Sequence, residues 1–324
     1  MSQRLNYIDE MKGFAILLVV LGHLFLPHTK EGSLFPTASI IYSFHMSFFF
    51  FLSGYVNNLI NNSQPKSRFI FFKKKVRSLL IPYLFWLLAA PVFLESSYPS
   101  NFTELIEKFI FFPNLHYWFL PTLFGFMMLY LLRSYMKKYD FIFSLCFIGA
   151  FVISGILMHQ YHLIIYGIYW TSFLLGDSLP KHNKFKHLIM KNHIYGISAL
   201  ILCIAWKFYP LETMGSAWKS MTNLILTAIC SFSACIFFFN FFQKCTLPIT
   251  VRKYMQQIGQ FSLVIYLIPI HLLPQGFIFS ENLPSIIINL SILIIGILHT
   301  IISYYIGKIV FCIPYLRYIM FGKI

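Results

Sequence analysis

The sequence contains little charge and very few acidic residues. Only 11% of its 324 residues are charged, and 10 Asp and Glu stand against 25 Lys and Arg. The six cysteines lie inside or at the ends of apolar runs, without C-x-x-C spacing or histidine partners, so we expect no disulfide and no metal site. Phosphate-binding P-loops, G-x-S-x-G elbows, H-E-x-x-H helices and dinucleotide fingerprints are also missing. Any catalysis must therefore use His, Lys, Arg, Asp and hydroxyl groups.

Apolar residues, in contrast, are abundant. They make up 58% of the chain, and the mean hydropathy is +0.71, more apolar surface than a soluble protein of this length could bury. We therefore expect an all-α, polytopic membrane protein. No loop is large enough to fold alone, so residues 1–324 are interpreted as a single transmembrane domain. No internal repeat is evident, which disfavours a pseudosymmetric transporter.

Ten apolar segments are long enough to cross a bilayer. The expected spans are 13–28, 36–58, 78–94, 117–132, 140–158, 162–178, 193–209, 220–242, 258–279 and 284–312. With both termini in the cytoplasm, the inner segments between these spans carry 21 of the 25 Lys and Arg, and the outer segments carry four. This asymmetry follows the positive-inside rule and supports ten helices. It also accounts for most of the net charge of +15, some of which faces anionic membrane lipids, so no nucleic-acid partner is expected.

The stretch from Arg4 to His23 is the most informative, because it places ionisable groups along one predicted helix. Lys12 and His23 are eleven residues apart, close to three turns, so they share a face and differ in depth by about 16 Å. Asp9 lies one turn before Lys12 on nearly the same side. His23 either forms a structural hydrogen bond to a neighbouring helix or lines a functional site. A cleaved signal peptide is disfavoured because no A-x-A-like site follows.

A second histidine is expected at a similar depth. His45 lies about 13 Å below the outer surface on the next, antiparallel helix. His23 and His45 could therefore flank one cavity, or each could bond separately to backbone or serine groups. Asp177 and Glu212 are interpreted as loop or helix-end acids without a role.

The segment 66–83 carries six cations before a proline-containing helix start. It certainly serves as a positive-inside signal. The group at Lys73, Lys74, Lys75 and Arg77 could in addition bind phosphates at the cytoplasmic mouth, since arginine forks and lysine point charges both suit phosphate oxygens.

Aromatic and histidine side chains gather at other predicted interfaces. His116 and Trp118 open the fourth expected span, where a sugar ring could stack on the indole, although an ordinary interfacial belt explains the tryptophan equally well. Further along, Pro269 is expected to bend the ninth span beside His271, with Tyr266 on the same segment.

Five stretches, in this order, resemble the successive signatures of acyltransferase family 3, a family of bacterial membrane O-acyltransferases. They are YIDEMKGFAILLVVLGH at 7–23, FHMSFFFFLSGYV at 44–56, KKVRSLLIPYLFW at 74–86, YWFLPTLF at 117–124 and IGQFSLVIYLIPIH at 258–271. The branch most similar is that of fucose 4-O-acetylases and other polysaccharide O-acetyltransferases. Order and spacing match along nearly the whole chain.

The resemblance implies transfer of an acetyl group from cytoplasmic acetyl-CoA to a hydroxyl of a cell-envelope glycan or lipid-linked sugar, in the bacterial inner membrane. It implies no permanently bound cofactor. His23 matches the family's essential first-helix histidine, and Lys74 and Arg77 match an R-x-x-R pair that handles the donor. Lys12 stands where many members have arginine. At Lys12 and Lys74 the charge is therefore kept but the bidentate fork is lost.

These residues give one mechanistic hypothesis and two competing classes. Residues 73–77 hold the CoA phosphates, His23 removes the acceptor's proton or briefly carries the acetyl group, and Asp9 or Lys12 orients the inner end, with His45 beside them. His116, Trp118, Tyr266 and His271 are expected to bind the acceptor. A flippase for lipid-linked glycans, or a membrane sensor without turnover, would share the helices and the basic loops.

Overall fold

The chain is almost entirely helical. The computed structural model describes residues 5–25, 35–61, 67–94, 117–136, 139–157, 162–208, 221–268 and 285–323. Within these ranges no strand occurs, which confirms the all-α prediction for that part of the chain.

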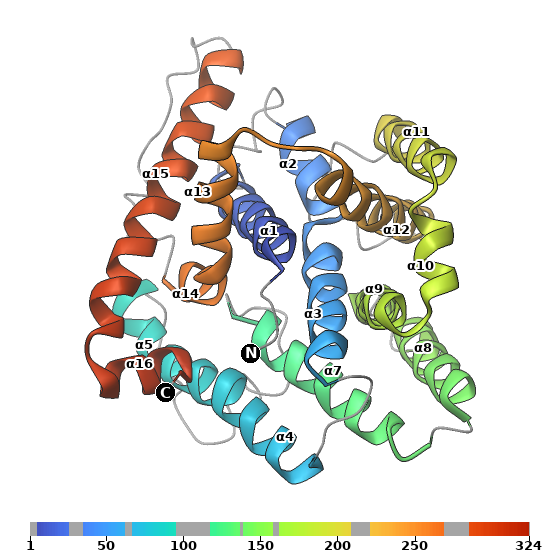
Figure 1. The fold of residues 1–324 in the computed structure, drawn as a ribbon, viewed down its shortest axis with the longest axis horizontal. Helices are drawn as coiled ribbons and strands as arrows, with labels where there is room; N and C mark the ends of the chain where they lie inside the picture. Colours follow the sequence, from blue (N-terminus) through green and yellow to red (C-terminus); the bar gives the residue numbers. More distant parts are fainter. Residues whose placement is uncertain are drawn as a thin grey trace.

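The described helices follow one another in a single up-and-down path (Figure 1). In the first half they are α1 (Asn6–Phe25), α2 (Phe35–Tyr42), α3 (His45–Asn61), α4 (Arg68–Lys75), the π-helix η2 (Val76–Leu80), α5 (Ile81–Leu94) and α7 (Phe119–Arg133). In the second half they are α8 (Asp140–Leu157), α9 (His162–Lys181), α10 (Asn183–Ile189), α11 (Asn192–Phe208), α12 (Met221–Lys244), α13 (Ile249–Gln260), α14 (Ser262–Leu267), α15 (Ser285–Phe311) and α16 (Pro314–Phe321).

Several of these helices are long and apolar enough to cross a membrane. Four such stretches occur in the described part of the chain, and the bent pair α10–α11, which turns by 60°, makes a possible fifth. The four are Thr37–Ile60, Asp140–Leu157, Thr222–Lys244 and Ile286–Phe311. All four fall on predicted spans. The full count of ten, and the cytoplasmic position of both termini, stay predictions.

Helix α1 occupies the centre of the bundle, where it packs against α13 and α15 on one side and α3 and α12 on the other (Figure 1). Two glycines allow α1 and α13 to touch backbone to backbone. A Cβ on Gly13 would overlap the Met255 carbonyl oxygen, and a Cβ on Gly259 would overlap the Asp9 carbonyl oxygen. Small residues permit such close approach between membrane helices. The reciprocal contact fixes the height of α1 relative to α13.

Helices α3 and α9 are joined in the same way. A side chain on Gly54 would overlap the Phe173 carbonyl oxygen, and one on Gly176 would overlap the Phe51 carbonyl oxygen. The sequence indicated a close backbone approach at Ser53-Gly54, and this is confirmed. Phe51 and Phe173 are themselves almost completely buried, so the two helices form one rigid unit in the core.

A buried ion cluster ties the ends of α3, α7 and α9 together. The Asp177 carboxylate is fully buried and accepts hydrogen bonds from Lys181 Nζ at 2.6 Å, Arg133 Nη1 at 3.0 Å and Asn58 Nδ2 at 2.7 Å. Arg133 also donates to Asp140, with Nη2 to Oδ2 at 2.7 Å. The interpretation of Asp177 as an acid without a role is wrong, because two cations and an amide converge on it.

The basic segment expected to precede a helix near residue 78 is itself helical. The chain is continuous from Arg68 through the π-helix η2 to the end of α5. Ser67 caps the start by accepting the Ile70 N–H at 3.4 Å, and the Phe71 ring packs 5.9 Å from that of Tyr130. This aromatic contact gives α4 a buried face that a count of charges could not reveal.

A second segment expected as an inner loop, residues 243–257, also contributes a helix. Helix α13 starts at Ile249 and breaks at Phe261, before the short α14. It is stabilised by the buried Glu10 of α1, which accepts hydrogen bonds from Arg252 Nε at 3.1 Å and Gln256 Nε2 at 2.7 Å. The bend predicted at Pro269 lies outside the described residues.

The glycine contact between α1 and α13 makes a testable prediction. Gly259→Val is expected to lower the melting temperature in detergent, because the new side chain overlaps the α1 backbone and overpacking costs about 1–3 kcal/mol or more. Gly196→Val in α11 is the matched control, since no atom lies within 4 Å of its Cβ position. Equal melting temperatures for the two variants would contradict backbone contact at Gly259.

The ion cluster makes a second prediction. Asp177→Asn leaves Arg133 and Lys181 without their shared carboxylate, and breaking a buried pair costs about 3–5 kcal/mol. Asp140→Asn should cost less, because the Asp140 side chain is 37% exposed and Arg133 keeps Asp177. Thermal unfolding of both variants, followed by size-exclusion chromatography in detergent, measures the difference. A larger loss for Asp140→Asn would reverse the assignment of the central acid.

Candidate active site

An internal cavity of about 230 Å³ lies between α1, α3, η2, α7 and α14. Its wall is largely apolar, formed by leucine, phenylalanine, valine and methionine side chains. The polar groups in that wall are Lys12, Ser53, Ser78, Ser262 and Tyr266. A narrow apolar space with a few convergent polar groups is typical of a binding or catalytic site.

The cavity follows one face of α1. Lys12 and Val19 both line it, and their spacing of seven residues corresponds to two turns, or about 10 Å along the axis. His23 continues this face one turn beyond Val19. The predicted shared face of Lys12 and His23 therefore coincides with the face of α1 that borders the cavity.

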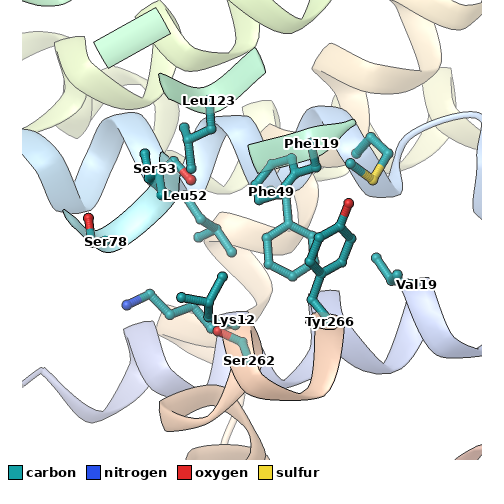
Figure 2. A pocket seen from close by; sticks show the side chains of 13 residues that line it. Lys12, Val19, Phe49, Leu52, Ser53, Ser78, Phe119, Leu123, Ser262 and Tyr266 are labelled. Atoms are coloured by element: carbon teal, nitrogen blue, oxygen red, sulfur yellow. The ribbon is translucent and has the colours of Figure 1, made fainter. Parts of the chain in front are cut away.

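Figure 2 shows that the two ends of the cavity differ in polarity. The Lys12 ammonium points toward the side where Ser78 lies, with Ser53 above it. Tyr266 and Val19 lie toward the opposite side, beside Phe119. A ligand lying along the cavity would therefore meet a cation and hydroxyls first, then apolar and aromatic surface, and then the level of His23.

His45 is held in one orientation next to this region. Its Nδ1 donates to the Ile41 carbonyl oxygen at 2.8 Å, and its ring stands edge-on to Tyr42 with the centroids 4.9 Å apart. Because a carbonyl only accepts, the neutral imidazole carries its proton on Nδ1 and presents Nε2 as an acceptor. His23 and His45 also lie near enough to interact electrostatically. That both face a single cavity stays a prediction.

The predicted acceptor-binding residues have different surroundings. Tyr266 borders the cavity and makes edge contacts to the rings of Phe119 at 5.6 Å and Tyr117 at 6.3 Å. Trp118 stacks on Tyr169 at 5.6 Å, so one face of its indole is already covered. His116 and His271 lie outside the described residues.

The four predicted phosphate-binding cations separate into two environments. Lys73 and Lys74 are exposed, whereas Lys75 and Arg77 are half-buried. Burial lowers the pKa of Lys75 to about 8, and the neighbouring Lys74 adds to this effect. Arg77 precedes Ser78 and Leu79, which both form part of the cavity wall. The half-buried cations are thus the ones next to the cavity.

Asp9 lies in a different position from the one expected. Its side chain is buried on α1, and its backbone forms the contact with Gly259, but it does not line the cavity. The neighbouring Glu10, which sequence reasoning passed over, makes the ion pair with Arg252.

Two further residues were missed for different reasons. Ser78 carries no pattern of its own and becomes part of the cavity wall only through the π-helix. Asp177 had a readable signal, because Lys181 follows it at the i+4 spacing that favours a helical ion pair.

These groups can bind an elongated ligand with an anionic or polar end, and they place two imidazoles near its other end. Acid–base or acyl-transfer chemistry at a hydroxyl fits such a set. No curated protein and no solved structure matches the chain in the comparisons made. The family model described as an acyltransferase domain matches residues 5–308, and the chain therefore belongs to acyltransferase family 3.

Proposed function

We propose that the protein is an O-acetyltransferase of the bacterial inner membrane. It moves an acetyl group from cytoplasmic acetyl-CoA to a hydroxyl of a cell-envelope glycan or lipid-linked sugar. Membership of the family supports acyl transfer in general. The donor, the acceptor and the polysaccharide O-acetylase branch are inferences from the site and from the sequence signatures.

The cavity is the observation that carries the proposal. At about 230 Å³ it is smaller than the roughly 300–1,000 Å³ of a typical small-molecule pocket. It therefore suits a narrow arm such as acetyl-pantetheine, while the bulky nucleotide stays outside. The apolar wall excludes water from a reactive thioester and so favours transfer over hydrolysis.

The charges give the donor a direction. The nucleotide phosphates belong near Lys75 and Arg77, which adjoin the cavity wall at Ser78. Lys12, with its ammonium on the Ser78 side, lies on the same approach (Figure 2). The thioester then lies deeper along α1, in the direction of His23.

The chemical step transfers one acetyl group and one proton. In the direct route, His23 Nδ1 or Nε2 takes the proton of the acceptor hydroxyl, and the oxygen attacks the thioester carbonyl. The C–S bond then breaks, and the CoA thiolate leaves and takes the proton from the imidazolium. In the alternative route His23 itself carries the acetyl group before the hydroxyl attacks. His45, with Nε2 available as an acceptor, is placed to assist either route.

The role of His23 can be tested directly. We expect His23→Ala to lower acetyl transfer by about 100-fold or more, because a positioned acid–base group contributes roughly 10²–10⁴-fold. The assay follows release of free CoA from acetyl-CoA by purified protein in nanodiscs, with envelope glycan as acceptor. His193→Ala, an exposed histidine on α11, is the matched control.

Two results of this assay would count against the proposal. Wild-type transfer by His23→Ala, at equal protein levels, would remove His23 from the chemistry. A folded wild-type protein that leaves the thioester intact with glycan present would favour the flippase alternative, and glycan transport would then be measured.

Lys12 is expected to act on donor binding more than on chemistry. Lys12→Met should raise the KM for acetyl-CoA about tenfold, since a hydrogen bond to a charged group contributes about 1.5–3 kcal/mol. Lys12→Arg keeps the charge and should retain most of the activity. Steady-state kinetics of the two variants decide the point, and an unchanged KM in Lys12→Met would exclude a role in holding the donor.

A further inference from the structure

The chain continues past the family domain, and this extension returns to the candidate site. The family match ends at residue 308, whereas α16 covers Pro314–Phe321 and packs against α5 (Figure 1). Phe321 is fully buried and stacks on Phe311 with ring centroids 5.7 Å apart. The Trp86 indole N–H donates to the Met320 carbonyl oxygen at 3.1 Å. The end of α16 is therefore anchored in the core.

The anchored end touches the π-helix η2. Gly322 caps α16 in the left-handed conformation at φ 61°, which glycine adopts without strain. A Cβ at Gly322 would overlap the Arg77 carbonyl oxygen and lie 2.8 Å from the Ser78 Cα. The backbone after α16 is thus in contact with the turn that carries Arg77 and places Ser78 in the cavity wall. Short π-helices often occur at functional sites.

Two arginines in this region have buried, unsatisfied nitrogens. The Nε atoms of Arg77 and Arg317 are buried and lack a hydrogen-bond partner. Neither guanidinium pairs with a carboxylate in the described ranges, where Glu10 pairs with Arg252, and Asp140 and Asp177 pair with other cations. Burying an unpaired cation is costly. An anionic ligand would remove that cost, and a phosphate suits the arginine fork.

We propose that α16 completes the donor site. Gly322 fixes the π-helical turn of Arg77, and Arg317 joins Arg77 in binding the phosphates of the acyl donor. This deepens the function proposed above and rests on it for the identity of the donor. The shared ligand chemistry is a phosphate group, which a nucleotide thioester or an anionic lipid headgroup could supply.

Donors with and without phosphates test Arg317. We expect Arg317→Gln to raise the KM for acetyl-CoA by about 10-fold or more, as loss of a charged hydrogen bond predicts. The KM for S-acetylpantetheine, which has no phosphate, and the kcat for acetyl-CoA should stay unchanged. Lys308→Gln is the matched control, because it removes an exposed positive charge from α15 nearby. An unchanged KM for acetyl-CoA, or an equal rise for both donors, would overturn the proposal.

A binding measurement separates this proposal from the proposed function. Thermal shifts of the protein by CoA alone require no turnover, so they report the anion site even if the enzyme reading fails. Weaker stabilisation of Arg317→Gln than of wild type supports the site. If folded wild type shows no shift with CoA, the donor site is wrong, and the turnover assay still decides on acetyl transfer.

The lipid alternative is tested in nanodiscs of two compositions. In phosphatidylcholine alone and in phosphatidylcholine with phosphatidylglycerol, the effect of Arg317→Gln on CoA binding should be the same. If the variant instead loses only a stabilisation by phosphatidylglycerol, the arginine binds lipid and the donor proposal is overturned.

The clamp is tested separately through Gly322. Gly322→Ala should raise the KM for acetyl-CoA several-fold, because a Cβ overlaps the Arg77 carbonyl and displaces the π-helical turn. Gly149→Ala in α8, where no atom lies within 4 Å of the Cβ position, is the control. Normal donor kinetics in a folded Gly322→Ala protein would exclude the clamp.

Discussion

The contact between the backbones of α1 and α13 is the constraint on which the site depends. Gly13 and Gly259 each lie against a carbonyl of the other helix, so neither helix can slide or rotate without a steric overlap. This fixes Lys12 and Val19 of α1 in the cavity wall, opposite Ser262 and Tyr266 of α14, which directly follows α13. Without a strong hydrophobic drive between helices in lipid, such close packing is what holds them in register.

Acidic side chains are scarce in this chain, and the structure concentrates them where helices must be joined. Glu10 links α1 to α13 through Arg252, and Asp177 links α9 to α3 and α7 through Asn58 and Arg133. A carboxylate in an apolar bundle is tolerated only when cations and amide groups satisfy it. The excess of basic residues is left for the surface and for the half-buried group near the cavity. That distribution suits a protein whose ligand supplies the missing negative charge.

The departures from the family signature acquire a structural context here. Lys12, which replaces an arginine, has its ammonium on the Ser78 side of the cavity, where a compact point charge is enough to meet a polar group. Lys74, the other replacement, is exposed on α4, whereas Arg77 keeps its guanidinium and lies half-buried in the π-helix. Of the R-x-x-R pair, the member nearer the cavity is therefore the one that retains the planar fork.

The sequence by itself determined the helical class, the apolar stretches and the common face of Lys12 and His23, because these depend on local hydrophobicity and on the 3.6-residue period. It also identified Tyr266 and the basic group at 73–77 through the spacing of signature stretches. The burial of Asp177, the helical state of 249–260 and the entry of Ser78 into the cavity wall were decided only by the tertiary structure. Each depends on a partner far away in the chain, as Asp177 does on Arg133, and Gly322 on Arg77. Local patterns contain no record of such partners, since packing between distant helices decides which groups meet.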